Sequence, residues 1–333
     1  MRSSVTTVLN EFILGAPFSA GEIAFSDSEY GAVTALCRQR AERDGLSLKQ
    51  LVLPTRSEAF RDLTSEGLAA LIVKQLSAKS KLLVLSHVMT GSGLKLPIRE
   101  IARETRARGI LLVVDGAHAP GAFDLDFTQY EDVDYYGGSL HKWVMAPKGT
   151  AFGWVPERNQ KLLSPRQAGW TTYDLPEPFY QFSEGQHGFA ARFLQSTSHD
   201  FAPFFGIPKT LELWKSWSPK AIHTRLLELQ TSLEKLMEAS DLNWPLASPE
   251  NIELRGPLLS YELPARHQAQ GFDLQRQILV AHSLQLAVSY FPSRGQGRWV
   301  LRFSPHIYVE RWRELSNEQW EFERAVEILT KFY

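Results

Sequence analysis

The chain has 333 residues, and its 36 Lys and Arg residues nearly balance its 37 Asp and Glu residues, which gives a formal net charge of -1 at pH 7. So small a net charge creates no strong field for nucleic acid or for an anionic lipid surface, and we expect neither as a partner. The length is sufficient for one large domain and a smaller one, each with its own core.

Cysteine content and hydropathy indicate a cytoplasmic protein. Cys37 is the single cysteine, which excludes an intrachain disulfide and a cysteine-rich metal site. Near the amino terminus, Asn10 and Glu11 interrupt an apolar run that a signal peptide would keep unbroken. No stretch approaches the ~20 apolar residues that a membrane-spanning helix needs, so we expect no membrane partner.

Short apolar runs alternate with amphipathic patterns through the first two-thirds of the chain. This alternation predicts an α/β fold with a mainly parallel sheet flanked by helices. The expected strands are 23–25, 51–53, 82–85, 110–114, 133–136 and 151–155. The expected helices between them are 30–43, 65–76 and 98–107.

The pattern changes after Pro208. A long helical pattern over 209–239, interrupted near Pro219, predicts a connector to a smaller α+β region. The expected elements of that region are strands near 258–263, 286–291 and 299–303 and a closing helix over about 317–332. We therefore divide the chain into a large domain over 1–208 and a connector with a small carboxyl-terminal domain over 209–333.

The segment 113–149 holds the most informative functional pattern. An apolar strand ends in Asp115, and a second apolar run leads into a Gly-Gly-Ser turn and the pair His141–Lys142. Ligands of parallel sheets bind beyond the carboxyl ends of the strands, so these groups can converge. A lysine there can form a Schiff base with an aldehyde cofactor, while a carboxylate keeps that cofactor's pyridinium nitrogen protonated. This pairing is typical of enzymes that use pyridoxal 5′-phosphate (PLP).

Each of these residues also has an ordinary structural interpretation. Asp115 suits the N-cap of a following helix, His118 suits a hydrogen-bonded structural histidine, and Lys142 taken alone suits a solvated surface charge. Partial burial on the Gly-Gly-Ser turn would lower the pKa of Lys142, which makes the free amine available as a nucleophile and proton carrier.

The runs DGAHAPG (115–121), SLHKW (139–143) and APKG (146–149) resemble the class V aminotransferase family of fold-type I PLP-dependent enzymes. The similarity is greatest to the isopenicillin N epimerase-like branch, with cysteine desulfurases as more distant relatives, and it extends from about residue 1 to the carboxyl terminus. It implies a fold-type I large domain with a mainly parallel central sheet, a smaller α+β carboxyl-terminal domain, and PLP as the cofactor.

The resemblance also implies roles for the residues of this segment. Lys142 is implied to carry the internal aldimine, Asp115 to pair with the pyridine nitrogen, and His118 to contact the ring oxygen. Ser139 and His141 are implied as ligands of the cofactor phosphate. The family further implies an amino-acid-like substrate and a homodimer with sites at the interface.

Three further positions follow the family order. Tyr30, in SEYGA, stands where relatives stack an aromatic or imidazole ring on the cofactor, although an exposed tyrosine at a helix start is the ordinary alternative. His87, in SHVMTGSG, falls near a polar residue that lies beside the cofactor in relatives. In STSHD, Thr197 takes the place of the family's glycine, and Ser198 that of a hydroxyl that reaches the phosphate of the neighbouring subunit.

The two ends of the chain complete the expected site. Arg302, in LRFSPHIY, resembles the arginine that grips the substrate α-carboxylate, which a planar guanidinium can bind through two parallel hydrogen bonds. The opening RSSVTTVLN resembles the first turn of a helix whose backbone N–H groups, here near Ser3 and Ser4, meet the phosphate. Relatives carry several dozen residues before this helix, so we expect a shortened amino terminus.

The sequence leaves the reaction open. PLP acts as an electron sink, so an epimerase, an aminotransferase or a lyase acting at the α-carbon of an amino acid all fit. The family branch favours an epimerase, whereas Cys37, in the middle of a helix, disfavours a cysteine desulfurase. Two alternatives are a catalytically impaired paralogue that acts through binding or dimerisation, and a metal-dependent hydrolase with Asp115, His118 and His141 as ligands.

Overall fold

The centre of the fold is a sheet with strand order β2-β1-β3-β4-β5-β6. The structure is a computed structural model that describes residues 1–54, 57–167, 169, 172, 188–193, 200–291, 297–309 and 321–331. Strands β1 to β5 pair in parallel, and β6 runs antiparallel to β5. β3 and β4 are apolar and buried along most of their length, as strands covered on both faces should be. The strands are β1 Glu22–Ser26, β2 Ser47–Leu51, β3 Ser80–Ser86, β4 Leu111–Gly116, β5 Tyr135–Ser139 and β6 Ala151–Trp154.

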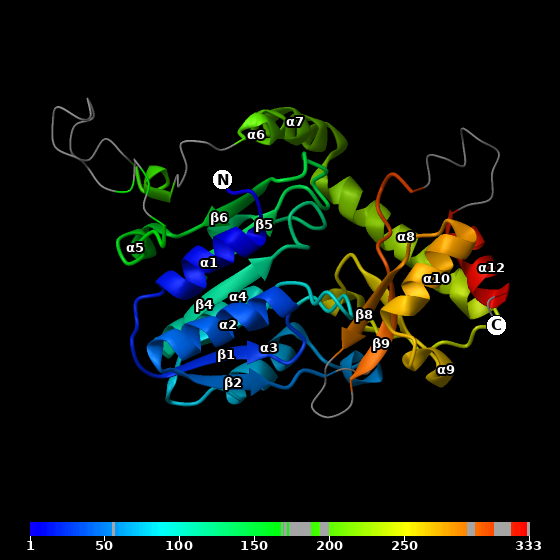
Figure 1. Ribbon diagram of the computed structural model, residues 1–333, viewed down its shortest axis with the longest axis horizontal. Helices are drawn as coiled ribbons and strands as arrows, with labels where there is room; N and C mark the ends of the chain where they lie inside the picture. The colour runs from blue at the N-terminus through cyan, green and yellow to red at the C-terminus, as the bar shows by residue number, and fades with distance from the viewer. Residues whose placement is uncertain are drawn as a thin grey trace.

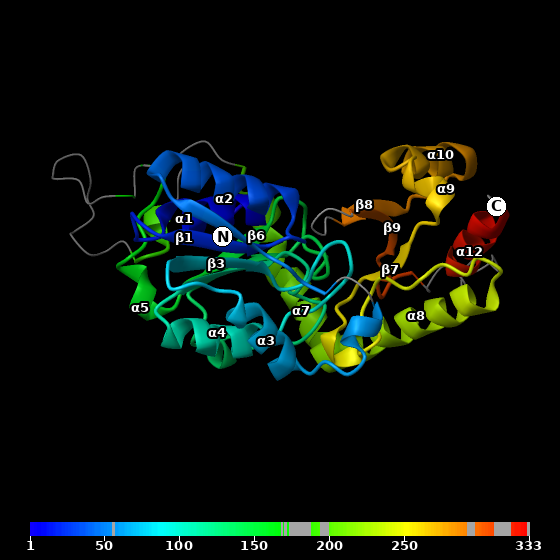
Figure 2. The same cartoon turned by 90° about the horizontal axis from the view of Figure 1, so that it is seen from below.

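Helices cover both faces of this sheet (Figure 1, Figure 2). On one face, α1 and α2 bury Val8, Phe12 and Leu36 against the strands. On the other face, α3 and α4 bury Leu68 and Ile101 in a second core. These helices are α1 Val5–Gly15, α2 Gly31–Asp44, α3 Ser65–Lys74 and α4 Ile98–Ala107, with short helical segments η1 Ser57–Phe60, η2 Phe127–Gln129, α5 Glu157–Gln160, η3 Ala191–Phe193 and α6 Ala202–Phe205.

A smaller antiparallel sheet of order β7-β9-β8 follows the connector helices α7 and α8. Figure 2 shows α8 running from α7 beneath this sheet toward α12. The elements are α7 Ile207–Trp217, α8 Pro219–Ala239, η4 Ile252–Leu254, β7 Leu259–Glu262, α9 Ala265–Gln268, α10 Phe272–His282, β8 Ala287–Phe291, β9 Arg298–Phe303 and α12 Glu321–Lys331. No helix in the described part of the chain is both long and apolar enough to cross a bilayer.

The expected α/β sheet with a smaller α+β region is confirmed, and three strands differ in detail. β5 lies at Tyr135–Ser139 rather than at 133–136, so the Gly-Gly-Ser sequence that was expected as a turn forms the end of this strand. β2 lies at Ser47–Leu51 rather than at 51–53. It is an edge strand, which can form from mostly exposed residues, and the apolar run at 51–53 comes after most of it, where the chain leaves the sheet and enters the core. β6 is antiparallel because the chain reverses through a loop after β5 instead of crossing over through a helix. The domain boundary at residue 208 stays a prediction.

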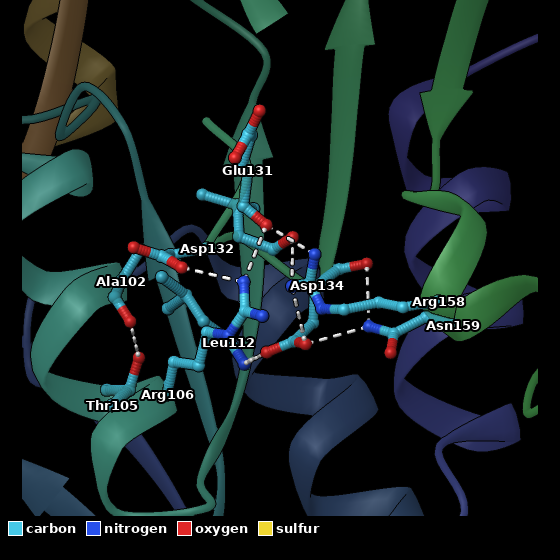
Figure 3. Close-up of polar contacts among 10 residues, drawn as sticks. Ala102, Thr105, Arg106, Leu112, Glu131, Asp132, Asp134, Arg158 and Asn159 are labelled. Carbon is cyan, nitrogen blue, oxygen red and sulfur yellow. Dashed lines mark hydrogen bonds and ion pairs between the residues drawn. The ribbon is translucent and has the colours of Figure 1, made fainter. Parts of the chain in front are cut away.

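A buried acid just before β5 links this strand to β4 and to the segment at 158–159 (Figure 3). Asp134 accepts hydrogen bonds from the Leu112 N–H at 2.8 Å, from Asn159 Nδ2 at 2.7 Å and from Arg158 Nη2 at 3.1 Å. Both of its oxygens are paired, so Asp134 is a structural residue. It lies at the end of the sheet opposite to Asp115.

Candidate active site

A cavity of about 350 Å³ opens at the carboxyl ends of the parallel strands. The strand register places Asp115 of β4 between Ser86 of β3 and Gly137 of β5. Among the predicted site residues, the cavity is lined by Ser4, Tyr30, Asp115, His118, Ser139, His141, Lys142 and Arg302. The fold therefore brings the first helix, the central strands and the smaller sheet to one place.

Asp115 is buried at the end of β4, with 5% of its surface exposed. Its Oδ1 accepts a hydrogen bond from the Ala117 N–H at 2.9 Å, and Oδ2 receives no hydrogen bond from the described residues. Burial raises the pKa of Asp115, while the Ala117 N–H and the charge of Lys142 oppose this rise. An acid in this state is suited to a cationic partner inside the cavity.

Lys142 and His118 form the polar pair at the centre of the cavity. Lys142 Nζ lies 3.1 Å from His118 Nε2, and the indole N–H of Trp143 donates to His118 Nδ1 at 3.3 Å. Burial lowers the pKa of Lys142, as does the charge of Arg302, although Asp115 acts in the opposite direction. Burial and the charges of Lys142 and Arg302 lower the pKa of His118 well below its usual value, so this imidazole is neutral.

Two backbone features hold the turn at residues 142–145, called the lysine turn below, against the turn that carries His118. Gly121 has a φ of +86°, and a Cβ there would come within 2.6 Å of the Val144 nitrogen and 2.7 Å of the Trp143 carbonyl carbon. Only glycine permits this approach. Met145, with a φ of +62°, closes the turn by donating its N–H to the Lys142 carbonyl. Strained backbone of this kind commonly occurs at functional sites.

Donors for an anion lie at the amino end of α1. Ser4 caps this helix by accepting the Thr7 N–H at 3.1 Å, and its first turn lines the cavity, where free N–H groups attract anions. Ser139 and His141 line the same cavity. His141 Nδ1 lies 2.9 Å from the Thr150 carbonyl, so Nδ1 carries the proton and Nε2 remains for a ligand.

Arg302 enters the cavity from β9 of the smaller sheet. Its Nη1 donates to the Thr90 carbonyl at 3.3 Å, while its buried Nε has no hydrogen-bond partner in the described part of the chain. Burial lowers the pKa of Arg302, although arginine stays charged. A buried guanidinium with an unpaired donor fits a carboxylate ligand.

Three predicted residues lie elsewhere. His87 does not line the cavity, because successive strand residues face opposite sides and Ser86 takes the cavity side. The His87 ring instead packs against Phe123, and its Nδ1 lies 2.8 Å from the Tyr136 hydroxyl; burial lowers its pKa to about 3. Ser3 precedes the N-cap and is not among the lining residues, which corrects its expected place. Ser198 lies outside the described residues.

Sequence reasoning missed Thr90, Trp143 and His306. Thr90 lines the cavity after β3, where position at a strand's carboxyl end was the available signal. Trp143 is 4% exposed and stacks on His306 with ring centroids 5.1 Å apart and an interplanar angle of 3°. No local sequence pattern reveals this contact, because one ring lies in the segment after β5 and the other in the segment after β9.

The metal-site alternative is not supported by the contacts of His118. Both of its ring nitrogens already engage protein groups, one with Lys142 and one with Trp143. Within the described ranges, no group of three His, Cys, Asp or Glu side chains converges to hold a metal ion. The polar groups of the cavity instead fit PLP: an amine for its aldehyde, an acid for its ring nitrogen and N–H and hydroxyl donors for its phosphate.

Comparisons with known proteins agree with this fit. The model of the family "Aminotransferase class-V" matches residues 3–256. The isopenicillin N epimerases of Streptomyces clavuligerus and Amycolatopsis lactamdurans are 32% and 28% identical over 311 and 313 residues, which cover 92% and 93% of this chain and 74% of each relative.

Comparison with solved structures shows what this fold is similar to. A variant of the cystine C–S lyase C-DES with glycine covalently linked to its PLP cofactor matches with a TM-score of 0.81 at 20% identity, covering 99% of this chain and 79% of that one. This likeness shows the fold, which is fold-type I. The family match and the 32% identical relative together show that this chain belongs to the aminotransferase class-V family of PLP-dependent enzymes, with PLP as its cofactor.

Proposed function

We propose that the chain catalyses an isopenicillin N epimerase-like reaction at the α-carbon of an amino acid or an amino-acid-derived substrate. The observation that carries the proposal is the single cavity shared by Lys142, Asp115 and Arg302. The two relatives titled isopenicillin N epimerase support the choice within the family.

Lys142 is assigned the catalytic role. When bound, PLP supplies the electron sink that allows a bond to the substrate α-carbon to break. Lys142 would hold the cofactor and then move the α-proton at Nζ on one face of the substrate. Epimerisation also requires proton transfer on the opposite face, by a second group to which no residue is assigned. The lowered pKa of Lys142 supports both of its roles, because the amine is neutral closer to physiological pH than that of an exposed lysine.

The remaining residues would bind and orient the cofactor. The free Oδ2 of Asp115 would face the ring nitrogen, and His118 would face the ring oxygen. Ser139, His141 and the first turn of α1 at Ser4 would hold the phosphate. Tyr30, which is 54% exposed, would cover the ring at the mouth of the cavity.

Arg302→Ala should raise the apparent KM for amino-acid substrates by about 10-fold or more, with a smaller change in kcat. The reason is the loss of charge-assisted hydrogen bonds to the carboxylate, which contribute about 1.5–3 kcal/mol. Steady-state kinetics measure the effect. Arg298→Ala on the same strand is the matched control, because Arg298 pairs with Glu262 away from the cavity and should keep its KM. An unchanged KM in Arg302→Ala would remove this residue from the substrate site.

A panel of L- and D-amino acids tests the reaction type. An epimerase should interconvert the enantiomers of its substrate and take up deuterium at the α-carbon from heavy water. An aminotransferase should form a keto acid without releasing ammonia, whereas a lyase should release its leaving group. If no amino acid is converted or changes the visible spectrum of the bound cofactor, the proposed function fails and the impaired paralogue is favoured.

Cysteine desulfurization is disfavoured by the position of the single cysteine. Cys37 lies on the buried face of α2, and burial raises the pKa of its thiol. Cys37 is not among the residues that line the cavity, so its thiol is poorly placed to accept sulfur there. Relatives titled cysteine desulfurase, such as that of Chlamydia muridarum at 25% identity, therefore support the family more than this activity.

We also propose the homodimer that the family resemblance implies, with Ser198 of each chain directed to the phosphate site of its partner. If a second chain completes the cavity, the protein should be active only in the associated state. Sedimentation equilibrium across a concentration series, followed in parallel with activity, tests this proposal. Full activity in a monomer would contradict it.

A further inference from the structure

The hydrogen bonds of His118 restrict the proton of Lys142. His118 Nδ1 lies 3.3 Å from Trp143 Nε1, and Nε2 lies 3.1 Å from Lys142 Nζ. An indole N–H is only a donor, so Nδ1 must be the acceptor in this pair. The neutral imidazole then carries its single proton on Nε2.

The second hydrogen bond follows from the first. With its proton on Nε2, His118 is the donor to Lys142 Nζ, which must supply a lone pair. An ammonium group has three donors and no acceptor, so a charged Lys142 would place two N–H groups against each other. A neutral Lys142 satisfies both contacts at once.

We propose that Trp143 is a positioning residue that keeps Lys142 in its neutral, nucleophilic form by fixing the tautomer of His118. The inference deepens the proposed function, since it gives the reason why the amine assigned to the cofactor is ready to react. Trp143 itself does not line the cavity, so it acts through His118.

Trp143 is held firmly enough for this role. Its ring is 4% exposed and lies parallel to the ring of His306, which in turn stacks on Tyr308 with centroids 4.2 Å apart. The close approach of Gly121 to the Trp143 backbone fixes the other side. His306 and Tyr308 follow β9, so the segment after Arg302 also supports the lysine turn.

The charges around Lys142 are compatible with a neutral amine. Asp115 on β4 favours the ammonium form, whereas burial and Arg302 on β9 disfavour it, and the balance lowers the pKa of Lys142. His118, in the turn after β4, is itself neutral. His141 and Tyr30 line the same cavity. The His118 tautomer adds to this balance, because a proton on Nε2 favours the neutral form of Lys142 over the charged form.

The tautomer can be observed directly in the full chain. Nitrogen NMR of ¹⁵N-histidine-labelled protein should show Nδ1 of His118 unprotonated and Nε2 protonated, with and without bound cofactor, and a His118→Gln variant identifies the signals. The opposite tautomer in the wild-type chain would overturn the inference, whatever the variants do.

The pH dependence of cofactor capture tests the consequence for Lys142. Trp143→Phe keeps a ring against His306 but removes the indole N–H, so His118 can carry its proton on Nδ1 and accept from a charged Lys142. The midpoint for PLP capture by the cofactor-free chain should shift upward by about one pH unit, which is roughly a tenfold slower capture on the acid side.

Trp214→Phe is the matched control. The Trp214 indole N–H donates to the Val144 carbonyl at 2.7 Å in the same core, so its loss costs a comparable hydrogen bond on the lysine turn without touching His118. Its capture midpoint should equal that of the wild type. Equal midpoints in wild type and Trp143→Phe would refute the inference while leaving the proposed function intact. A wild-type chain that captures no PLP would instead refute the function, and the NMR result would still decide the tautomer.

Discussion

Lys142→Ala should abolish the visible absorption of the bound cofactor and lower turnover by at least about 10³-fold, the upper range for loss of a positioned proton-transfer group. Among the described lining residues, Lys142 supplies the amine of the cavity, and Arg302 is too strongly basic to replace it. Absorption spectra of wild type and variant measure the first effect. Borohydride treatment followed by peptide mass mapping should place the cofactor on Lys142 in the wild type.

The control for this substitution lies on the same loop. Lys148 is exposed six residues later and does not line the cavity, so Lys148→Ala should retain both the absorption and the turnover. A cofactor label that survives in Lys142→Ala, or that maps to another lysine, would show that the amine has been misassigned.

The sequence predicted those site residues that belong to continuous patterns. Asp115 lies at the end of a continuous apolar strand, and Lys142 follows the Gly-Gly-Ser sequence that ends β5, so both were found from local spacing and both face the cavity. Arg302 came from the resemblance alone. The parallel sheet could also be predicted from the sequence, because strands such as β3 and β4 are apolar on both faces.

The residues that sequence reasoning misplaced or missed depend on side-chain direction and on distant contacts. His87 follows Ser86 directly, and the alternation of a strand decides which of the two enters the cavity. Trp143 and His306 are far apart in the chain, and their stacking forms only when the segments that follow β5 and β9 come together in the fold. The edge strand β2 was misplaced because its polar residues carry no strong pattern.

Asp115→Asn should leave the cofactor bound but lower turnover by roughly 10²-fold. The amide keeps the size of the side chain and can still accept the Ala117 N–H, so the end of β4 should not change. It cannot supply a negative charge for the ring nitrogen, and a charge-assisted hydrogen bond contributes about 1.5–3 kcal/mol. Turnover measured at saturating PLP, together with the cofactor content, tests this expectation.

Stability separates this functional acid from a structural one. Because burial raises the pKa of Asp115 in the folded chain, the ionised form costs folding free energy at pH above that value, and this cost is absent below the unfolded pKa. Asp115→Asn removes the cost, so the cofactor-free variant should unfold at a temperature at least as high as the wild type near pH 7. Asp134→Asn should do the reverse, since it weakens the pairing of Arg158 and the Leu112 N–H and so lowers the unfolding temperature while keeping turnover. A loss of stability in Asp115→Asn that matches the loss in Asp134→Asn would show that Asp115 is held for the fold rather than for the cofactor.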